Sequence, residues 1–190
     1  MKKTHDFDSV FDSQEVFRLI LDATAHPLTP VNLKPYTKKI PFNEPQFLAI
    51  AMTLLDNEVS FNTCENGELS HNIRSLTLSS RKDIADADFV FVSNTSDLED
   101  VIQNAKCGTD TNPHDTAAVI VKIDNEKEDV EAFQGPGIQN ELFTQIHPMV
   151  NKAIALRDNM FFEFPKGIDL FFVDHDDNLF AVPRTLKKVV

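Results

Sequence analysis

The chain has 190 residues, of which 42% are hydrophobic and 16 are phenylalanine, and its formal net charge is −12. These values are typical of a globular chain with a substantial core and exclude a disordered one. The acidic excess argues against nonspecific binding to nucleic acid or to an anionic membrane, because both depend on basic surface. We expect one domain over residues 1–190.

Helix and strand patterns alternate along the first half of the chain. Ser13 can cap a helix that runs to about Ala25, and His26-Pro27 should end it, because the residue before a proline is disfavoured in the α region. Asn43 is predicted to cap a second helix with Pro45 in its first turn. The other elements expected here are an edge strand at 28–33, the apolar body of the second helix at 47–55, a strand at 59–62 and a weaker helix at 69–78.

Buried strands dominate the second half. Residues 89–92 are a continuous apolar run too short for a helix, which is typical of a strand covered on both faces, and 117–123 repeat that pattern. Ser96 and Glu99 have capping-box spacing and predict a helix that ends near Cys107-Gly108. The remaining expectations are a charged turn at 125–128, a run at 130–133 leading to a glycine loop, and a helix from Pro148 to Asp158.

The last segment predicts a β-hairpin. Its strands are 168–173 and 179–182, and Pro183 should end the second strand because it cannot donate to a ladder. Asp174, Asp176 and Asn178 alternate as in the first half of a calcium loop. However, Leu179 and Thr185 occupy the positions that need Gly and Glu, so a solvated turn is favoured. Together the elements predict an α/β fold, three-layer with a mixed sheet.

Few residues suggest chemistry on their own. Gly135 and Gly137 flank Pro136 in a loop that could approach a phosphate or simply bend the chain. Arg184 suits an anion, or equally an ion pair with Asp169 on the neighbouring strand. The six histidines form no H-x-H or H-x-x-x-H pair, so a metal site would need distant residues to converge. His114 is expected at the surface.

The cysteines and a cluster of phenylalanines give two further predictions. Cys64 and Cys107 lie far apart with no C-x-x-C, so two reduced thiols are expected. Phe161, Phe162 and Phe164 crowd before the hairpin and either fill the core or lie at a protein interface. The N-terminus has no apolar signal sequence and no run reaches about 20 apolar residues, which favours a cytoplasmic protein.

Several short motifs occur in an order that resembles a known family. They are F-P-K-G-I-D-L at 164–170, P-R-T at 183–185, His26-Pro27, T-L-L-D-N at 53–57, Gly108-Thr109 and G-P-G-I at 135–138. The set resembles the H-subunit family of the bacterial carbon–phosphorus lyase system, which degrades organophosphonates. Residues 34–45 and 140–160 fit that pattern only loosely.

This resemblance carries its own expectations. It implies a fold like a truncated large domain of pyridoxal-phosphate-dependent transferases. It also implies that this cofactor is not used, so Lys166, which lies between Pro165 and Gly167, is not expected to form a Schiff base with it. It implies an accessory subunit that joins the carbon–phosphorus lyase subunits G, I and J, that can form a homodimer when isolated, and that has no activity alone. The assembly forms ribose 1-alkylphosphonate 5-triphosphate from ATP and an alkylphosphonate, and a separate iron–sulfur protein breaks the carbon–phosphorus bond. The alternative is a stand-alone enzyme or binding protein for a phosphorylated metabolite.

Overall fold

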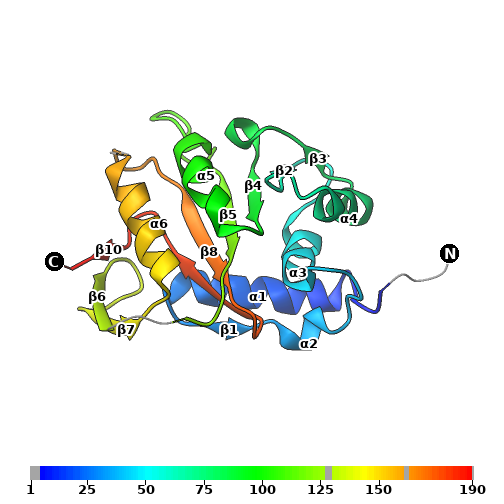
Figure 1. The fold of residues 1–190 in the computed structure, drawn as a ribbon, viewed down its shortest axis with the longest axis horizontal. Coiled ribbons are helices and arrows are strands. Elements are labelled where there is room, and N and C mark those ends of the chain that lie inside the picture. The colour runs from blue at the N-terminus through cyan, green and yellow to red at the C-terminus, as the bar shows by residue number, and fades with distance from the viewer. Residues whose placement is uncertain (1–4, 127–129, 161–162, 190) are drawn as a thin grey trace.

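A seven-stranded mixed sheet forms the centre of the computed structural model, which describes residues 5–126, 130–160 and 163–189. Its strand order is β1-β9-β8-β5-β4-β2-β3 (Figure 1). Five strands are parallel: β2 (Ser60–Asn62), β3 (Ser80–Arg81), β4 (Phe89–Val92), β5 (Ala118–Lys122) and β8 (Asp169–Val173). The antiparallel strands β9 (Asn178–Val182) and β1 (Val31–Asn32) complete one edge.

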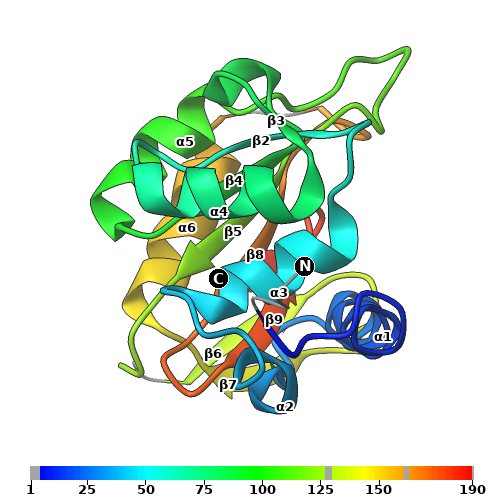
Figure 2. The same cartoon turned by 90° about the vertical axis from the view of Figure 1, so that its right-hand side faces the viewer.

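Helices cover both faces of this sheet. One face is covered by α5 (Leu98–Asn104) and α6 (Pro148–Asn159). The opposite face is covered by α1 (Phe11–Ala25), α3 (Pro45–Leu54) and α4 (Gly67–Thr77). A hydrophobic core lies on each face of the sheet, and successive residues of β5 point into opposite cores. Val119 and Val121 pack on the α5 side, whereas Ile120 packs on the α3 side. Figure 2 shows the sheet lying between the two helical layers.

A second, smaller sheet lies at one end of the molecule (Figure 1). It consists of β6 (Val130–Gln134), flanked by β7 (Leu142–Gln145) and β10 (Lys187–Lys188), all antiparallel. The buried Arg157 of α6 ties the C-terminal segment to this end, since its guanidinium donates to the carbonyl oxygens of Pro183 and Leu186. Short pieces complete the fold: α2 (Lys34–Thr37) and single 3-10 turns at Ile84–Asp86 and Thr95–Asp97.

The α/β class and the mixed sheet predicted from the sequence are confirmed. The apolar run at 89–92 forms the buried strand β4, and residues 118–122 form β5. The terminal hairpin is also present, and Asp174 closes its turn by accepting hydrogen bonds from the backbone N–H groups of Asp176 and Asn178. Strands β3, β7 and β10 were not predicted, because they lack a run of buried apolar residues: β3 and β10 are exposed, and β7 alternates between half-buried and exposed residues.

The predicted helix caps were wrong. Helix α1 begins before Ser13, and Asp8 accepts the N–H groups of Val10 and Phe11. At α3 the N-cap position is Glu44, whereas the Asn43 side chain donates to Glu68.

The capping box at Ser96 does not form either. Ser96 lies in the 3-10 turn before α5 and donates its own backbone N–H to Asn94 Oδ1. Helix α5 then ends at Asn104, before the expected stop at Cys107-Gly108.

Other sequence predictions have different outcomes. Cys64 and Cys107 are both free. Phe161 and Phe162 lie outside the described residues, as does the second half of the charged turn predicted at 125–128. Within the described part of the chain, no helix is both long and apolar enough to cross a bilayer.

Candidate functional site

A polar site lies at the carboxyl ends of β5 and β8. Ligands of open α/β sheets bind beyond this edge. A pocket of about 260 Å³ opens there, between residues 123–126 after β5, the β8–β9 turn, residues 144–147 before α6, and Leu28 and Pro30. Four separate stretches of chain therefore converge on one small cavity.

Asp124 and His147 are the central polar pair of this pocket. His147 is buried, and its Nε2 lies 2.6 Å from Asp124 Oδ1. Its Nδ1 accepts the backbone N–H of Met149 at 2.9 Å, so the imidazole also caps helix α6. Since Nδ1 is the acceptor, the ring proton is on Nε2, which donates to Asp124.

Hydrogen bonds favour the charged form of Asp124. The backbone N–H of Glu126 donates to Oδ1, and together with the His147 hydrogen bond it holds the pKa of Asp124 below its ordinary value. The side-chain ligand atoms of Asp124, Glu126 and His147 lie within 4.8 Å of one another. The pocket therefore presents fixed negative charge beside one oriented N–H donor.

These three residues do not fit a resident metal ion. A protonated Nε2 cannot bind a metal, and moving the proton to Nδ1 would set it against the Met149 N–H and remove the helix cap. The two remaining carboxylates are solvent-exposed and too few to fill the coordination sphere of a divalent cation.

The start of α6 does not fit an anion either. Pro148 has no N–H, Met149 donates to His147 Nδ1, and Val150 donates to the His147 carbonyl oxygen. The first-turn donors that would bind a phosphate are thus already satisfied.

The predicted glycine loop is packed against its neighbours. A Cβ at Gly137 would lie 2.2 Å from the Ala25 carbonyl oxygen, and Gly137 has φ of +81°. A Cβ at Gly135 would lie 3.1 Å from Leu186 Cα. This packing accounts for both glycines through backbone approach to α1 and to the C-terminal segment.

Arg184 forms the ion pair with Asp169 that the sequence left open. Its Nη2 lies 2.6 Å from Asp169 Oδ2, and its Nη1 donates to the carbonyl oxygens of Pro113 and Pro165. The side chain is 19% exposed, so most of its hydrogen-bonding capacity is used within the protein. This pair lies at the amino end of β8, the edge opposite the pocket.

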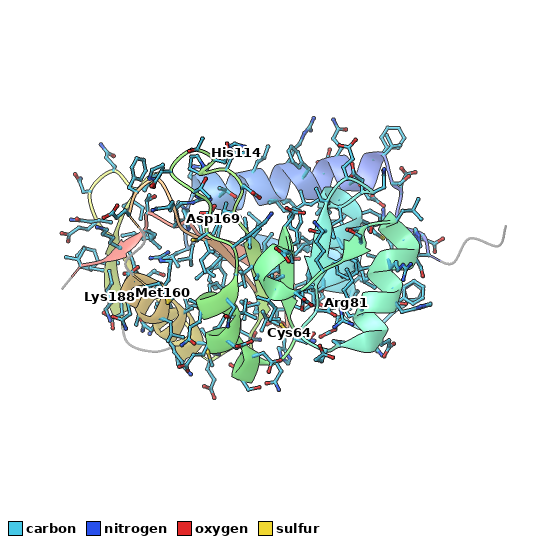
Figure 3. The ribbon with its side chains drawn as sticks, turned by 90° about the horizontal axis from the view of Figure 1, so that it is seen from above. Cys64, Arg81, His114, Met160, Asp169 and Lys188 are labelled. Atoms are coloured by element: carbon cyan, nitrogen blue, oxygen red, sulfur yellow. The ribbon has the colours of Figure 1, made fainter. Side chains whose placement is uncertain are left out.

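The other residues singled out from the sequence are occupied or exposed. Lys166 pairs with Asp110 at 2.9 Å, and this hydrogen bond raises the lysine pKa, the opposite of what a Schiff-base lysine needs. His114 is exposed, as expected (Figure 3).

A second, more open hollow lies beyond β2 and β4. Cys64 and Arg81 border it and are close together in Figure 3, and its volume is about 680 Å³. Cys64 and Glu65 both have positive φ, at 48° and 64°. Burial, with help from Asp97, raises the pKa of the Cys64 thiol to about 12, so it is a poor nucleophile at neutral pH.

Sequence reasoning missed the Asp124–His147 pair. The available signal was local: Asp124 follows a buried strand, and His147-Pro148 opens a helix with proline in its first turn. Nothing in the sequence indicated that these two positions meet.

Two comparisons with known proteins bear on function. A family model described as bacterial phosphonate metabolism protein (PhnH) matches residues 5–188. No curated protein matches the chain.

Proposed function

Since the chain belongs to the PhnH family of bacterial phosphonate metabolism proteins, we propose that it is an accessory subunit of the carbon–phosphorus lyase core complex. In this role it supports formation of ribose 1-alkylphosphonate 5-triphosphate from ATP and an alkylphosphonate, in the cytoplasm. The family match over nearly the whole chain is the observation that carries the proposal.

The charge distribution supports an accessory role. ATP and alkylphosphonates are strongly anionic, so an enzyme that binds them alone needs available cations. Among the described residues, the buried or partly buried lysines and arginines are each paired with a carboxylate: Lys39, Lys106, Lys122, Arg157, Lys166 and Arg184. The pocket beside His147 is lined by acidic groups instead. Partner proteins of the complex are therefore expected to supply the phosphate-binding groups.

Phe164 marks a candidate surface for docking those partners. Its side chain is 82% exposed, and it precedes Pro165, whose carbonyl oxygen accepts from Arg184. Aromatic residues and arginine are enriched at protein interfaces. We propose that this surface, with Asp169, contacts another protein of the lyase core complex, or a second copy of the chain in an isolated homodimer. Gly135 and Gly137 are further candidates for an interface.

Two further parts of the proposal concern fold and cofactor. We infer a distant kinship with the large domain of pyridoxal-phosphate-dependent transferases, because the family resemblance implies it. We expect no bound pyridoxal phosphate, since the ammonium group of Lys166 is held by Asp110. An aldimine absorbance band that disappears in Lys166→Ala would contradict this expectation.

The stand-alone enzyme remains the alternative, but the packing of Gly137 against Ala25 gives its proposed phosphate loop no support. Turnover separates the two functions: the isolated chain should release no adenine from ATP plus an alkylphosphonate, and the reconstituted assembly should. Adenine release by the isolated chain, free of contaminants, would favour the alternative.

Co-purification tests the docking surface. Phe164→Ser should leave thermal stability unchanged, because the ring is exposed, and should reduce recovery of the other core-complex proteins. Phe143→Ser is the matched control, since that ring is 66% exposed on β7 of the small sheet. Equal losses in both variants, or none in Phe164→Ser, would refute this surface.

A further inference from the structure

The pocket beside His147 combines an apolar floor with a carboxylate rim. Leu28, Ile123 and Phe180 supply apolar side chains from three different parts of the chain. Asp124 and Glu126 follow β5 and supply carboxylates. A cavity of about 260 Å³ with this lining has room for a small organic group and no room for a nucleotide.

None of the described residues that line the pocket is a lysine or an arginine, so no ammonium or guanidinium group among them neutralises the negative charge of the rim. Asp174 and Asp176 lie across the opening and add to the negative potential while their own carboxylates hold the β8–β9 turn and Asn125. The preferred occupant therefore carries positive charge.

Two oxygen sites remain for such an occupant. Asp124 uses Oδ1 for both His147 and the Glu126 backbone, and among the described residues its Oδ2 accepts no hydrogen bond. The Glu126 carboxylate likewise has no hydrogen-bond partner in the described part of the chain. Carboxylate oxygens in this state accept strong, charge-assisted hydrogen bonds from N–H donors.

The apolar floor of the pocket favours an organic cation over a metal ion as the ligand. A hydrated divalent cation gains nothing from Leu28, Ile123 and Phe180, and His147 cannot coordinate it while capping α6. An aliphatic stem buries apolar surface against the same side chains, and its charged head stays at the rim.

We propose that this pocket binds an ammonium or guanidinium group on a short aliphatic stem. The head donates to Asp124 Oδ2 and Glu126, and the stem lies on the apolar floor. A free alkylamine and a lysine or arginine side chain of another protein offer the same chemistry. This inference is independent of the proposed role in phosphonate metabolism.

Methyl NMR titration of the full chain tests the proposal. Butylguanidinium and butylammonium should produce saturable shifts at the methyl groups of Leu28 and Ile123, and butanol at equal concentration should not. Glu126→Gln should weaken binding roughly tenfold, as expected for loss of one charge-assisted hydrogen bond. Glu15→Gln on α1 is the control, because it removes an exposed carboxylate far from the pocket lining.

A blocked Ala-Arg-Ala peptide distinguishes the two sources. Binding of the peptide at least as tightly as butylguanidinium supports a protein side chain, and exclusion of the peptide supports a free amine. The proposal is overturned if butanol binds as well as the cations, or if no probe gives saturable shifts. It is also overturned if affinity survives in both Glu126→Gln and the Asp124→Asn/Glu126→Gln double variant.

Discussion

His147 joins two elements through a single ring. Its Nδ1 satisfies an N–H of the first turn of α6, and its Nε2 donates to Asp124 on the loop after β5. Because each nitrogen has a fixed role, the neutral ring with hydrogen on Nε2 is the form that satisfies both contacts.

Substitution of His147 should separate these two roles. His147→Ala removes the cap, and loss of an N-cap costs about 1 kcal/mol in the free energy of unfolding. His147→Asn restores a side-chain acceptor for the cap but does not reach Asp124 in the same way, so it should recover most of this loss. Urea denaturation measures both variants, and equal destabilisation by Asn and Ala would argue against the capping role.

Arg184 is a structural anchor at the opposite edge of the sheet. Arg184→Ala removes the side-chain donors to Asp169 and to the carbonyl oxygens of Pro113 and Pro165, and leaves Asp169 Oδ1 only the backbone N–H of residue 184. It should lower the free energy of unfolding by about 1.5–3 kcal/mol. A double-mutant cycle with Asp169→Asn should show coupling between the two side chains. Additive effects in that cycle would mean that the ion pair contributes no stability.

Among elements, the loop after β6 depends on close contact with the end of α1. Gly137→Ala would place a methyl group against the Ala25 carbonyl oxygen at a positive φ, and should destabilise the protein by roughly 2 kcal/mol. Gly67→Ala is the control, because a Cβ there meets no atom within 4 Å at the first turn of α4. Thermal unfolding should show a loss for Gly137→Ala and a small gain for Gly67→Ala. An unchanged midpoint in Gly137→Ala would contradict the contact.

The elements that could be predicted from the sequence are those with a continuous run of apolar residues. Residues 89–92 and 118–122 are buried on both faces, and no tertiary detail is needed to recognise them. The predictions of helix caps were wrong because several short polar side chains near a helix start can accept the same backbone N–H groups. At α1 the acceptor is Asp8, although Ser13 has the better local pattern. The pocket could not be predicted, because Asp124 and His147 meet only after β6 and β7 fold back between them.

At the scale of the whole molecule, a half-buried acid–base cluster links three segments and makes stability depend on pH. Asp88 accepts from Lys106 Nζ at 2.5 Å and from Ser60 Oγ at 2.6 Å. Burial alone would raise the pKa of Asp88, but these hydrogen bonds outweigh it and lower the pKa below 3.8. Burial would lower the pKa of Lys106, but its bonds to Asp115 and Asp88 raise it above 10.5.

The sign of each shift fixes the pH window. The Asp88 contribution is present above the unfolded pKa of 3.8 and is lost as pH falls through the lower folded value. The Lys106 contribution is present below 10.5 and is lost as pH rises through the higher folded value. Asp88→Asn should cost roughly 1 kcal/mol at neutral pH and flatten the acid limb of a plot of unfolding free energy against pH. An acid limb identical to that of the natural chain would show that other carboxylates dominate it.

The pairing order of the two sheets has a consequence for folding. Among the described residues, the edge strand β1 pairs with β9 and the edge strand β10 pairs with β6, so residues 178–188 complete both sheets. Removal of residues 178–188 should therefore leave β1 and β8 without the strand that pairs with both of them, and β6 with one open edge. Unpaired strand edges of this kind expose backbone donors and acceptors and promote aggregation.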